Sequence, residues 1–329
     1  MTPKRKIWIL LVATLAAVLM GCKSGKVALD EPTENLGIIS HTMPSETMQE
    51  SANKDWVIAA ITKDYNWDDS VGNRNEVRIR LPHLNSDLPF AVEFNNHIES
   101  YATEITKEID ACVAGAFSTH IISIDYETWQ NNDILSILII TNTATDYVEY
   151  QVWNFDLDDG ETLSTAEMCD KYLDLEYPQF LKYTRDMILL EFQTDFADFI
   201  KSYPAEYEFM QNLYLSDRLI VLHYELFLNE EGKLMLVADR PSIAGAMSYS
   251  AVKEFVIDAN LVSNEADAWN WLFDLYLSSD SDNEEYAAQL LRIAYEENND
   301  AFTDAMQQRT SSEISAIQTA LRANKTEDG

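Results

Sequence analysis

The side chains that most often carry metal or acid–base chemistry are present, but their spacing matches no site pattern. The five histidines are far apart, and the chain has no His-Glu-x-x-His, Cys-x-x-Cys, Gly-x-Ser-x-Gly or glycine-rich phosphate-binding motif. The 56 acidic residues guarantee many chance carboxylate pairs. The sequence therefore predicts no metal, no cofactor and no catalytic residue. A glycan hydrolase that uses two of the acids stays open as an alternative.

The acidic run DLDDGE, residues 156–161, is the strongest single metal candidate. Its glycine stands at the fifth position and not at the sixth, so the spacing differs from that of an EF-hand even though Glu167 stands at the twelfth. Aspartate and glycine both favour tight turns, aspartate by bonding to nearby backbone and glycine by accepting positive φ. We expect a turn stabilised by aspartate side chains instead of a calcium site.

The first cysteine stands in a pattern typical of lipid attachment. Lys4, Arg5 and Lys6 precede an uncharged run over residues 7–21, which is shorter than the roughly 20 residues of a membrane span. The tetrad Leu-Met-Gly-Cys at positions 19–22 resembles the bacterial lipobox, in which a peptidase cuts before the cysteine and the thiol receives diacylglycerol. We expect cleavage after Gly21, lipidation of Cys22 and anchoring on the extracytoplasmic face of a bacterial membrane. The alternative is an ordinary signal peptide with a chance cysteine.

Two further cysteines, Cys112 and Cys169, would remain in the exported chain. Leftover thiols in an oxidising compartment can pair. Buried free thiols are the alternative. Each cysteine lies in or beside a predicted helix, and the sequence leaves both possibilities open.

Composition and charge narrow the class of partner. The chain is 47% hydrophobic and 11% aromatic, which is ample for a globular core. A formal charge of −33 argues against nucleic-acid binding, which requires basic patches. Such a charge keeps a secreted protein soluble and favours cations or basic partners. It does not determine the oligomeric state.

The chain divides into four predicted parts: a signal peptide (1–21), a flexible tether (22–53), an α+β module (54–261) and a helical C-terminal appendage (262–329). The tether is rich in Ser, Thr, Glu and Pro and has no periodic apolar face. As a random coil it would span roughly 30 Å.

The sequence predicts two strands at the centre of the module, over residues 134–140 and 148–155. The first run is almost continuously apolar and β-branched, which is typical of a strand covered on both faces. In the second run, Val148, Tyr150 and Val152 alternate with polar residues until the phase changes at 153–155, which indicates a bulge or a change of burial. A turn at 159–160 and a capping box at 164–167 should follow.

The remaining elements complete an α+β fold in which helices pack on an antiparallel meander. We expect a strand or short helix over 56–61, an edge strand over 77–82 that ends at Pro82, and strands over 120–129, 134–141, 148–157, 219–228, 233–238 and 251–257. Residues 239–246 predict an irregular connection. Helical periodicity covers 90–111, 163–173, 178–199, 265–277, 284–296, 300–308 and 311–323.

Two aromatic groups have both a structural and a functional interpretation. Trp129, Tyr147, Tyr150 and Trp153 would form a carbohydrate-binding platform if they shared one face of the sheet, but aromatic residues are also common in packed strands. The aromatic helix around Trp269 fits docking on the sheet domain or a partner-binding groove. We favour core packing and docking.

The order of these pieces resembles one extracellular module. It is the domain of unknown function found C-terminally in some peptidoglycan deacetylases and in a lysozyme-sensing anti-sigma factor. The similarity covers about residues 77–260. It is carried by a strand ending in proline (77–82), a helix opening near residue 90, IDYE (124–127), LSI (135–137), NFDLDDGETLS (154–164), LFLNEEGKL (226–234) and the closing segments 241–244 and 251–256.

The resemblance implies a fold and an extracellular setting. Members often carry a Gly-Gly-Ala-His-like tract between the two central strands, whereas residues 142–147 read NTATDY here, so any function of that tract is in doubt. The deacetylase's own catalytic motifs are absent. We therefore expect a membrane-anchored lipoprotein that acts as a non-enzymatic binding or sensing module for an envelope glycan or a basic protein. A scaffold whose helical tail recruits a partner is a further alternative.

Overall fold

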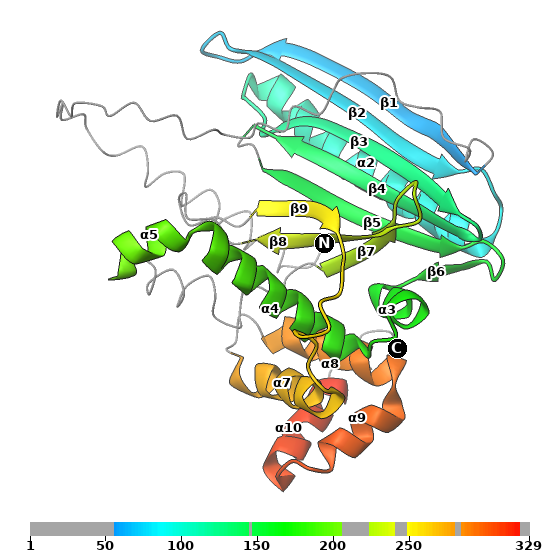
Figure 1. Cartoon of the computed structure of the whole chain (residues 1–329). Coiled ribbons are helices and arrows are strands. Elements are labelled where there is room, and N and C mark those ends of the chain that lie inside the picture. The colour runs from blue at the N-terminus through cyan, green and yellow to red at the C-terminus, as the bar shows by residue number, and fades with distance from the viewer. Residues whose placement is uncertain (1–55, 145–146, 206–223, 241–248, 280–283, 323–329) are drawn as a thin grey trace. The chain divides into compact units, whose positions relative to one another are not determined.

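The computed structural model describes residues 56–144, 147–205, 224–240, 249–279 and 284–322, all of which belong to one compact unit. Over these residues the chain forms a six-stranded sheet, a three-stranded sheet and eight helices (Figure 1). The predicted α+β class is confirmed. The proposed signal peptide and tether lie outside the described residues, as do Gly21 and Cys22.

The larger sheet has its strands in chain order: β1 (Val57–Asp68), β2 (Arg74–Leu84), β3 (Ile121–Asn131), β4 (Ile134–Thr143), β5 (Val148–Asp156) and β6 (Glu161–Leu163). All neighbours are antiparallel except β2 and β3, which the crossover helix α2 (Pro89–Gly115) connects. One face of α2 buries Phe94, Ile98 and Ile109 against this sheet.

The central meander of β3, β4 and β5 is confirmed. Every side chain from Ile134 to Ile139 is buried, as expected for a strand covered on both faces. The β4–β5 register runs unbroken, so the phase change in β5 is a change of burial and not a bulge. Trp153 and Phe155 pack towards α2, while Asn154 is buried on the opposite face.

The prediction of an edge strand that ends at Pro82 is wrong. The strand continues to Leu84, and β1 lies outside it as the true edge. Pro82 is tolerated because it pairs with Ala59 at a register shift in β1 and lies beyond the two residues of β2 that pair with β3.

The second sheet contains β7 (Tyr224–Leu228), β8 (Leu234–Arg240) and β9 (Tyr249–Glu254), in that order. It packs on the face of the larger sheet opposite α2. Phe227 and Val237 meet Leu138 there, and Phe227 stacks on Trp129 with ring centroids 5.1 Å apart. Residues 219–223 of the predicted hairpin and 241–246 of the predicted connection lie outside the described residues.

The other face of the small sheet forms one core with the remaining helices. These are α3 (Thr165–Leu173), α4 (Tyr177–Asp195), α5 (Ala197–Ser202), α7 (Glu265–Ser278), α8 (Glu284–Glu297), α9 (Asn299–Met306) and α10 (Ser311–Arg322). Trp269 and Phe273 of α7 are buried beside Leu226 and Leu236 of the sheet, as docking of the aromatic helix predicts. The capping box of Ser164 and Glu167 opens α3 as expected.

A buried polar bridge joins the two sheets. The Ser136 hydroxyl donates to Asn154 Oδ1 at 2.7 Å, and it accepts a hydrogen bond from Leu228 N at 3.1 Å. Asn154 Nδ2 donates to the Leu226 carbonyl at 2.7 Å. Ser136 and Asn154 thus satisfy two backbone groups of β7, and they fix the small sheet in one position on the large one.

We predict that Asn154→Ala lowers the free energy of unfolding by about 2–4 kcal/mol, because it leaves the Leu226 carbonyl and the Ser136 hydroxyl buried without their partner. Urea denaturation followed by tryptophan fluorescence measures the loss. Asn96→Ala, on the exposed face of α2, is the control and should stay within about 0.5 kcal/mol of the wild type. A loss below 1 kcal/mol for Asn154→Ala would refute the bridging role.

Candidate functional site

The four aromatic residues considered as a carbohydrate platform do not share a face. Trp129 and Tyr150 are packed between the two sheets, and the Tyr147 hydroxyl lies 3.4 Å from Ser250 Oγ of β9. Trp153 faces the other way, where its ring lies 5.3 Å from Phe94 and 5.0 Å from His97. These side chains serve packing, as the core interpretation expects.

Both described cysteines are free thiols, so the structure does not form the pairing between Cys112 and Cys169. Cys112 lies against the core beneath α2, whereas Cys169 is fully buried in the helical core. Burial raises the pKa of both thiols, most strongly that of Cys169. The two thiols lie in separate cores, where they serve packing.

A polar pocket at one end of the larger sheet is the best candidate for a binding site. It is an open hollow of about 540 Å³, lined by residues from three separate segments: Trp56, Gln130, Asn132, Asp133, Leu157 and Asp158. We call it the end pocket. It combines one indole ring, two side-chain amides and two carboxylates.

Local backbone structure fixes the walls of this pocket. Asn132 adopts a φ of 54° in the two-residue turn between β3 and β4, and its carbonyl accepts a hydrogen bond from Gln130 Nε2 at 2.9 Å. The Asp133 carbonyl accepts from Leu157 N at 2.7 Å, which ties the turn to the end of β5. Trp56 is held by its carbonyl, which accepts from Asn85 N at 2.7 Å.

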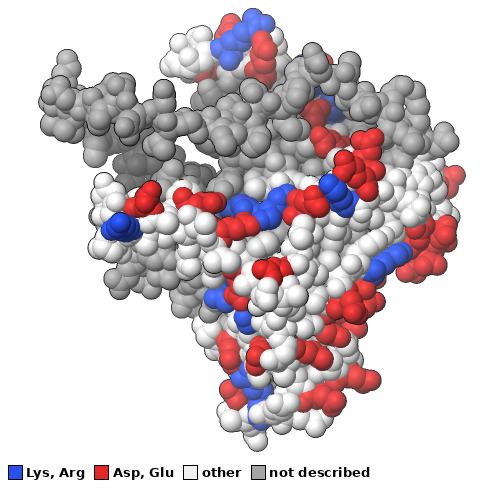
Figure 2. All heavy atoms as spheres, in the orientation of Figure 1, with Lys and Arg blue, Asp and Glu red and all other residues white. Residues whose placement is uncertain are grey.

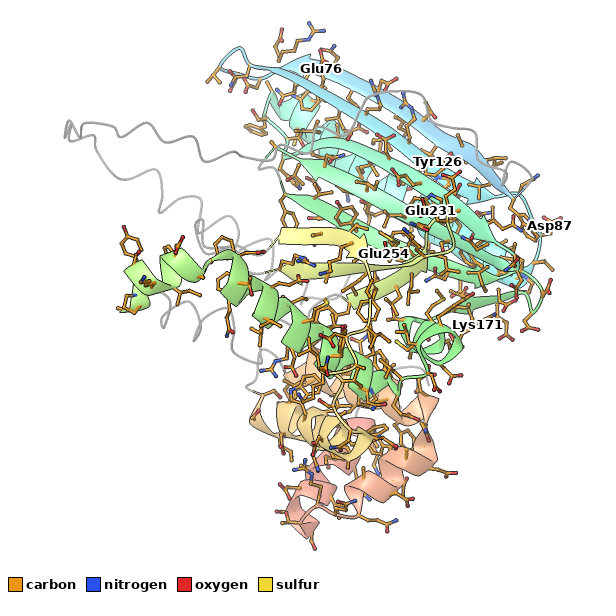
Figure 3. The ribbon with its side chains drawn as sticks, in the orientation of Figure 1. Glu76, Asp87, Tyr126, Lys171, Glu231 and Glu254 are labelled. Atoms are coloured by element: carbon orange, nitrogen blue, oxygen red, sulfur yellow. The ribbon has the colours of Figure 1, made fainter. Side chains whose placement is uncertain are left out.

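Lys171 of α3 (Figure 3) pairs with two aspartates, one of which lines the pocket. Its ammonium donates to Asp156 Oδ2 at 2.6 Å and lies 3.6 Å from Asp133 Oδ2. This hydrogen bond lowers the pKa of Asp156 and raises that of Lys171. Asp156 also accepts from the backbone amides of Asp158 and Asp159, so it builds the turn expected for this acidic run.

The end pocket has the groups that polyhydroxylated ligands require. Amides and carboxylates pair with hydroxyl groups, and an indole ring offers a rigid apolar surface that can pack on the face of a sugar ring. Within the described part of the chain, no group of three His, Cys, Asp or Glu residues is arranged to hold a metal ion. The arrangement therefore suits binding by hydrogen bonds and stacking.

Sequence reasoning placed residues 130–133 in a turn and 156–161 in another, but it did not bring them together. Trp56 is more than seventy residues before the turn and joins it only through the sheet. The signal that could have pointed here was the accumulation of Asn, Gln and Asp at two turns that an antiparallel meander places at the same end.

A second unusual group lies between the sheets, away from the end pocket. The Glu225 carboxylate on β7 accepts a hydrogen bond from Val152 N at 3.1 Å, which satisfies an amide on the outer edge of β5. Burial raises the pKa of Glu225 to about 7, opposed by that hydrogen bond and reinforced by Asp239. Asp239 in turn accepts from Ser250 Oγ.

Comparisons with known proteins assign no family. No family model matches the chain, and no curated protein matches it. Among solved structures, a DUF3298 family member from Bacteroides fragilis NCTC 9343 has a TM-score of 0.31 and 10% sequence identity, covering 60% of this chain and 89% of that one. That family is a domain of unknown function. A likeness this distant carries no argument, so the resemblance to the deacetylase-linked module stays a prediction.

We predict that Glu225→Gln removes a pH dependence of stability. The folded-state pKa of about 7 lies above the ordinary value of 4.5, so the stability contributed by protonated Glu225 is present below pH 4.5 and is lost as the pH rises through 7. Between pH 5 and 8, the free energy of unfolding of the wild type should fall by about 2–3 kcal/mol relative to that of the variant. The amide oxygen of the variant can still accept the hydrogen bond from Val152 N.

Urea unfolding of both proteins at pH 5, 6, 7 and 8 measures this difference. Glu230→Gln, an exposed residue in the turn of the same hairpin, is the control and should track the wild type at each pH. A stability difference between wild type and Glu225→Gln that stays constant across this range would contradict the prediction.

Proposed function

We propose that this chain is a lipid-anchored extracytoplasmic protein that binds an envelope glycan in the end pocket without converting it. The composition of that pocket is the observation that carries the proposal. Trp56, whose ring centroid lies 6.3 Å from that of Phe90, would supply the apolar surface, and Gln130, Asn132, Asp133 and Asp158 would supply hydrogen-bonding groups. A hollow of about 540 Å³ lies within the usual size range of small-molecule sites and suits one or two sugar rings.

The predicted lipid anchor would keep the glycan-binding protein at a membrane surface. Diacylglycerol on Cys22 would hold the protein at a bacterial membrane, and the tether of residues 22–53 would connect it to the folded part. Among the described residues, no helix has the length and apolar character to cross a membrane. Acidic side chains are spread among basic and uncharged ones on the face seen in Figure 2, and the formal charge of −33 favours basic partners.

A glycan hydrolase is the second candidate, because Asp133 and Asp158 line the same pocket. Asp133 Oδ2 lies 3.6 Å from the Lys171 ammonium, an ion pair that engages one of the two carboxylates. Binding needs only the hydrogen-bonding and apolar groups that the pocket supplies, so it is the first candidate.

The scaffold alternative cannot be tested by deleting the C-terminal helices. Trp269, Phe273 and Phe302 of the C-terminal helices are buried in the core that also covers the small sheet. Deleting residues 265–329 would expose that core, so loss of a partner after deletion would not separate recruitment from unfolding. Point variants on the exposed faces of these helices are the informative test.

We predict that soluble peptidoglycan fragments bind the mature protein and that Trp56→Ala weakens their affinity at least tenfold, or about 1.4 kcal/mol. Asn132→Ala should weaken it in the same direction, because it removes an exposed side-chain amide from the pocket. Isothermal titration measures both affinities. The control is Tyr203→Ala, an aromatic residue that is 52% exposed at the end of α5.

Two outcomes would overturn this function. If wild type, Trp56→Ala and Asn132→Ala bind the fragments with equal affinity and have unchanged melting temperatures, the end pocket is not the binding site. New reducing ends that disappear in Asp133→Asn and Asp158→Asn would instead establish hydrolysis.

We also predict that the mature protein begins at Cys22 with diacylglycerol on its thiol, and that Cys22→Ser releases it from the membrane fraction. Mass spectrometry of the N-terminal peptide and fractionation of cells check the two statements. An intact start methionine, or unmodified Cys22 on a protein inside the cell, would rule out the anchor.

A further inference from the structure

A second, smaller hollow lies between α7 and α9, in the helical part of the molecule (Figure 1). Its volume is about 230 Å³, and it is lined by the first two turns of α7, by the second half of α9 and its start, and by Gln308. We call it the helix hollow. Three alanines and the Trp269 ring supply its apolar surface, and the side chains of Glu265, Asn270, Asp304 and Gln308 supply carboxylates and amides.

The two carboxylates of the helix hollow are not used elsewhere in the fold. Within the described part of the chain, neither Glu265 nor Asp304 makes a hydrogen bond or an ion pair. The start of α7 is capped by Asn264, whose Oδ1 accepts from Asp267 N at 2.9 Å. Asp304 lies in the last turn of α9, where the helix dipole opposes a negative charge, so the stability of α9 gives no reason for a carboxylate there.

The basic residues of the C-terminal helices do not neutralise the hollow. Residues 262–322 contain no lysine and three arginines, none of which lines it. Arg309 is the nearest of them in sequence, and its Nη1 is engaged by Asp274 Oδ1 at 2.5 Å. Arg292 and Arg322 belong to α8 and α10. A hollow lined by two carboxylates and no base favours a cationic group.

The indole N–H of Trp269 is a buried donor without an acceptor. Trp269 lines the hollow and is only 1% exposed, and over the described residues its Nε1 makes no hydrogen bond. The centroids of the Phe302 and Phe273 rings lie 5.6 and 6.1 Å from that of Trp269, and neither ring carries an oxygen that could accept. Leaving a buried donor unpaired costs free energy, so a ligand that brings an acceptor to Trp269 gains affinity.

A peptide that begins with a free amino group has both of the groups that the hollow requires. Its α-ammonium has three N–H donors for the two carboxylates, and the carbonyl of the same residue is an acceptor for the indole. A lysine side chain brings an ammonium with no carbonyl beside it, and a free amino acid adds a carboxylate that the two acids oppose. A volume of about 230 Å³ is below the usual range of small-molecule sites and suits a single residue with a small side chain.

We propose that the helix hollow binds the free N-terminus of a peptide. The α-ammonium pairs with Glu265 and Asp304, the first carbonyl accepts from Trp269 Nε1, and the first side chain packs on the alanines. The partner is thus a chain end and not an internal loop. The proposal is independent of the glycan function, because the helix hollow and the end pocket share no residue.

Two matched peptides test the proposal: trialanine amide with a free amino group, and the same peptide with that group acetylated. Isothermal titration of the mature protein at pH 6.5 should show binding of the free peptide and an affinity at least tenfold lower for the acetylated one. An α-amino group has a pKa of about 8, so the affinity of the free peptide should fall as the pH rises from 6.5 to 9. In a proton–nitrogen spectrum, the Trp269 indole signal, assigned by its loss in Trp269→Phe, should move with the free peptide only.

Glu265→Gln and Asp304→Asn should each weaken binding of the free peptide at least fivefold, because each removes one charge and keeps the size of the side chain. Asp300→Asn is the matched control, since this exposed acid belongs to α9 but does not line the hollow, and it should leave the affinity unchanged. Melting temperatures of the three variants separate binding from folding. Equal affinities for the two peptides, no binding of either, or full affinity in both Glu265→Gln and Asp304→Asn would overturn the proposal.

Discussion

The whole arrangement depends on the buried polar contact between β4, β5 and β7. Apolar packing between two sheets is not directional, so Leu138, Phe227 and Val237 alone would allow the small sheet to slide on the large one. The Ser136 and Asn154 side chains remove that freedom because they pair with one amide and one carbonyl of β7. The helical core forms on the other face of the small sheet, and this contact therefore also fixes where that core lies relative to the meander.

Glu225 completes the same interface by another means. Among the described strands, none pairs with the outer edge of β5 along residues 148–153, and an open edge of this kind invites pairing with another chain. Glu225 occupies one of them, Val152 N, from the neighbouring sheet. The consequence is a carboxyl that folding places where its charge is poorly solvated. The Glu225 side chain thus both pairs with an amide on the open edge of β5 and has a raised pKa.

The sequence predicted the meander, the capped α3 and the amphipathic α2, because each depends on local periodicity and turn chemistry. It could not predict that β7, β8 and β9 form a separate sheet. A strand with alternating apolar and polar residues has the same pattern whether it extends one sheet or begins another. Here the strand β7 packs on the face of the larger sheet, where it covers Asn154, and does not pair with the edge of β5. Trp153 and Trp129 show the same limit, since only the β4–β5 register and the second sheet decide which face each ring occupies.

Sequence analysis did not assemble the end pocket for a related reason. Asn132, Asp133 and Asp158 are ordinary turn formers in sequence, and they meet Trp56 only where three segments come together in the fold. The same antiparallel geometry that gathers Trp56, Asn132 and Asp158 at one end of the sheet sends the β1–β2 turn and the end of α2 to the other. A sheet with long strands therefore keeps the side chains of these two ends apart, and each end has its own local chemistry.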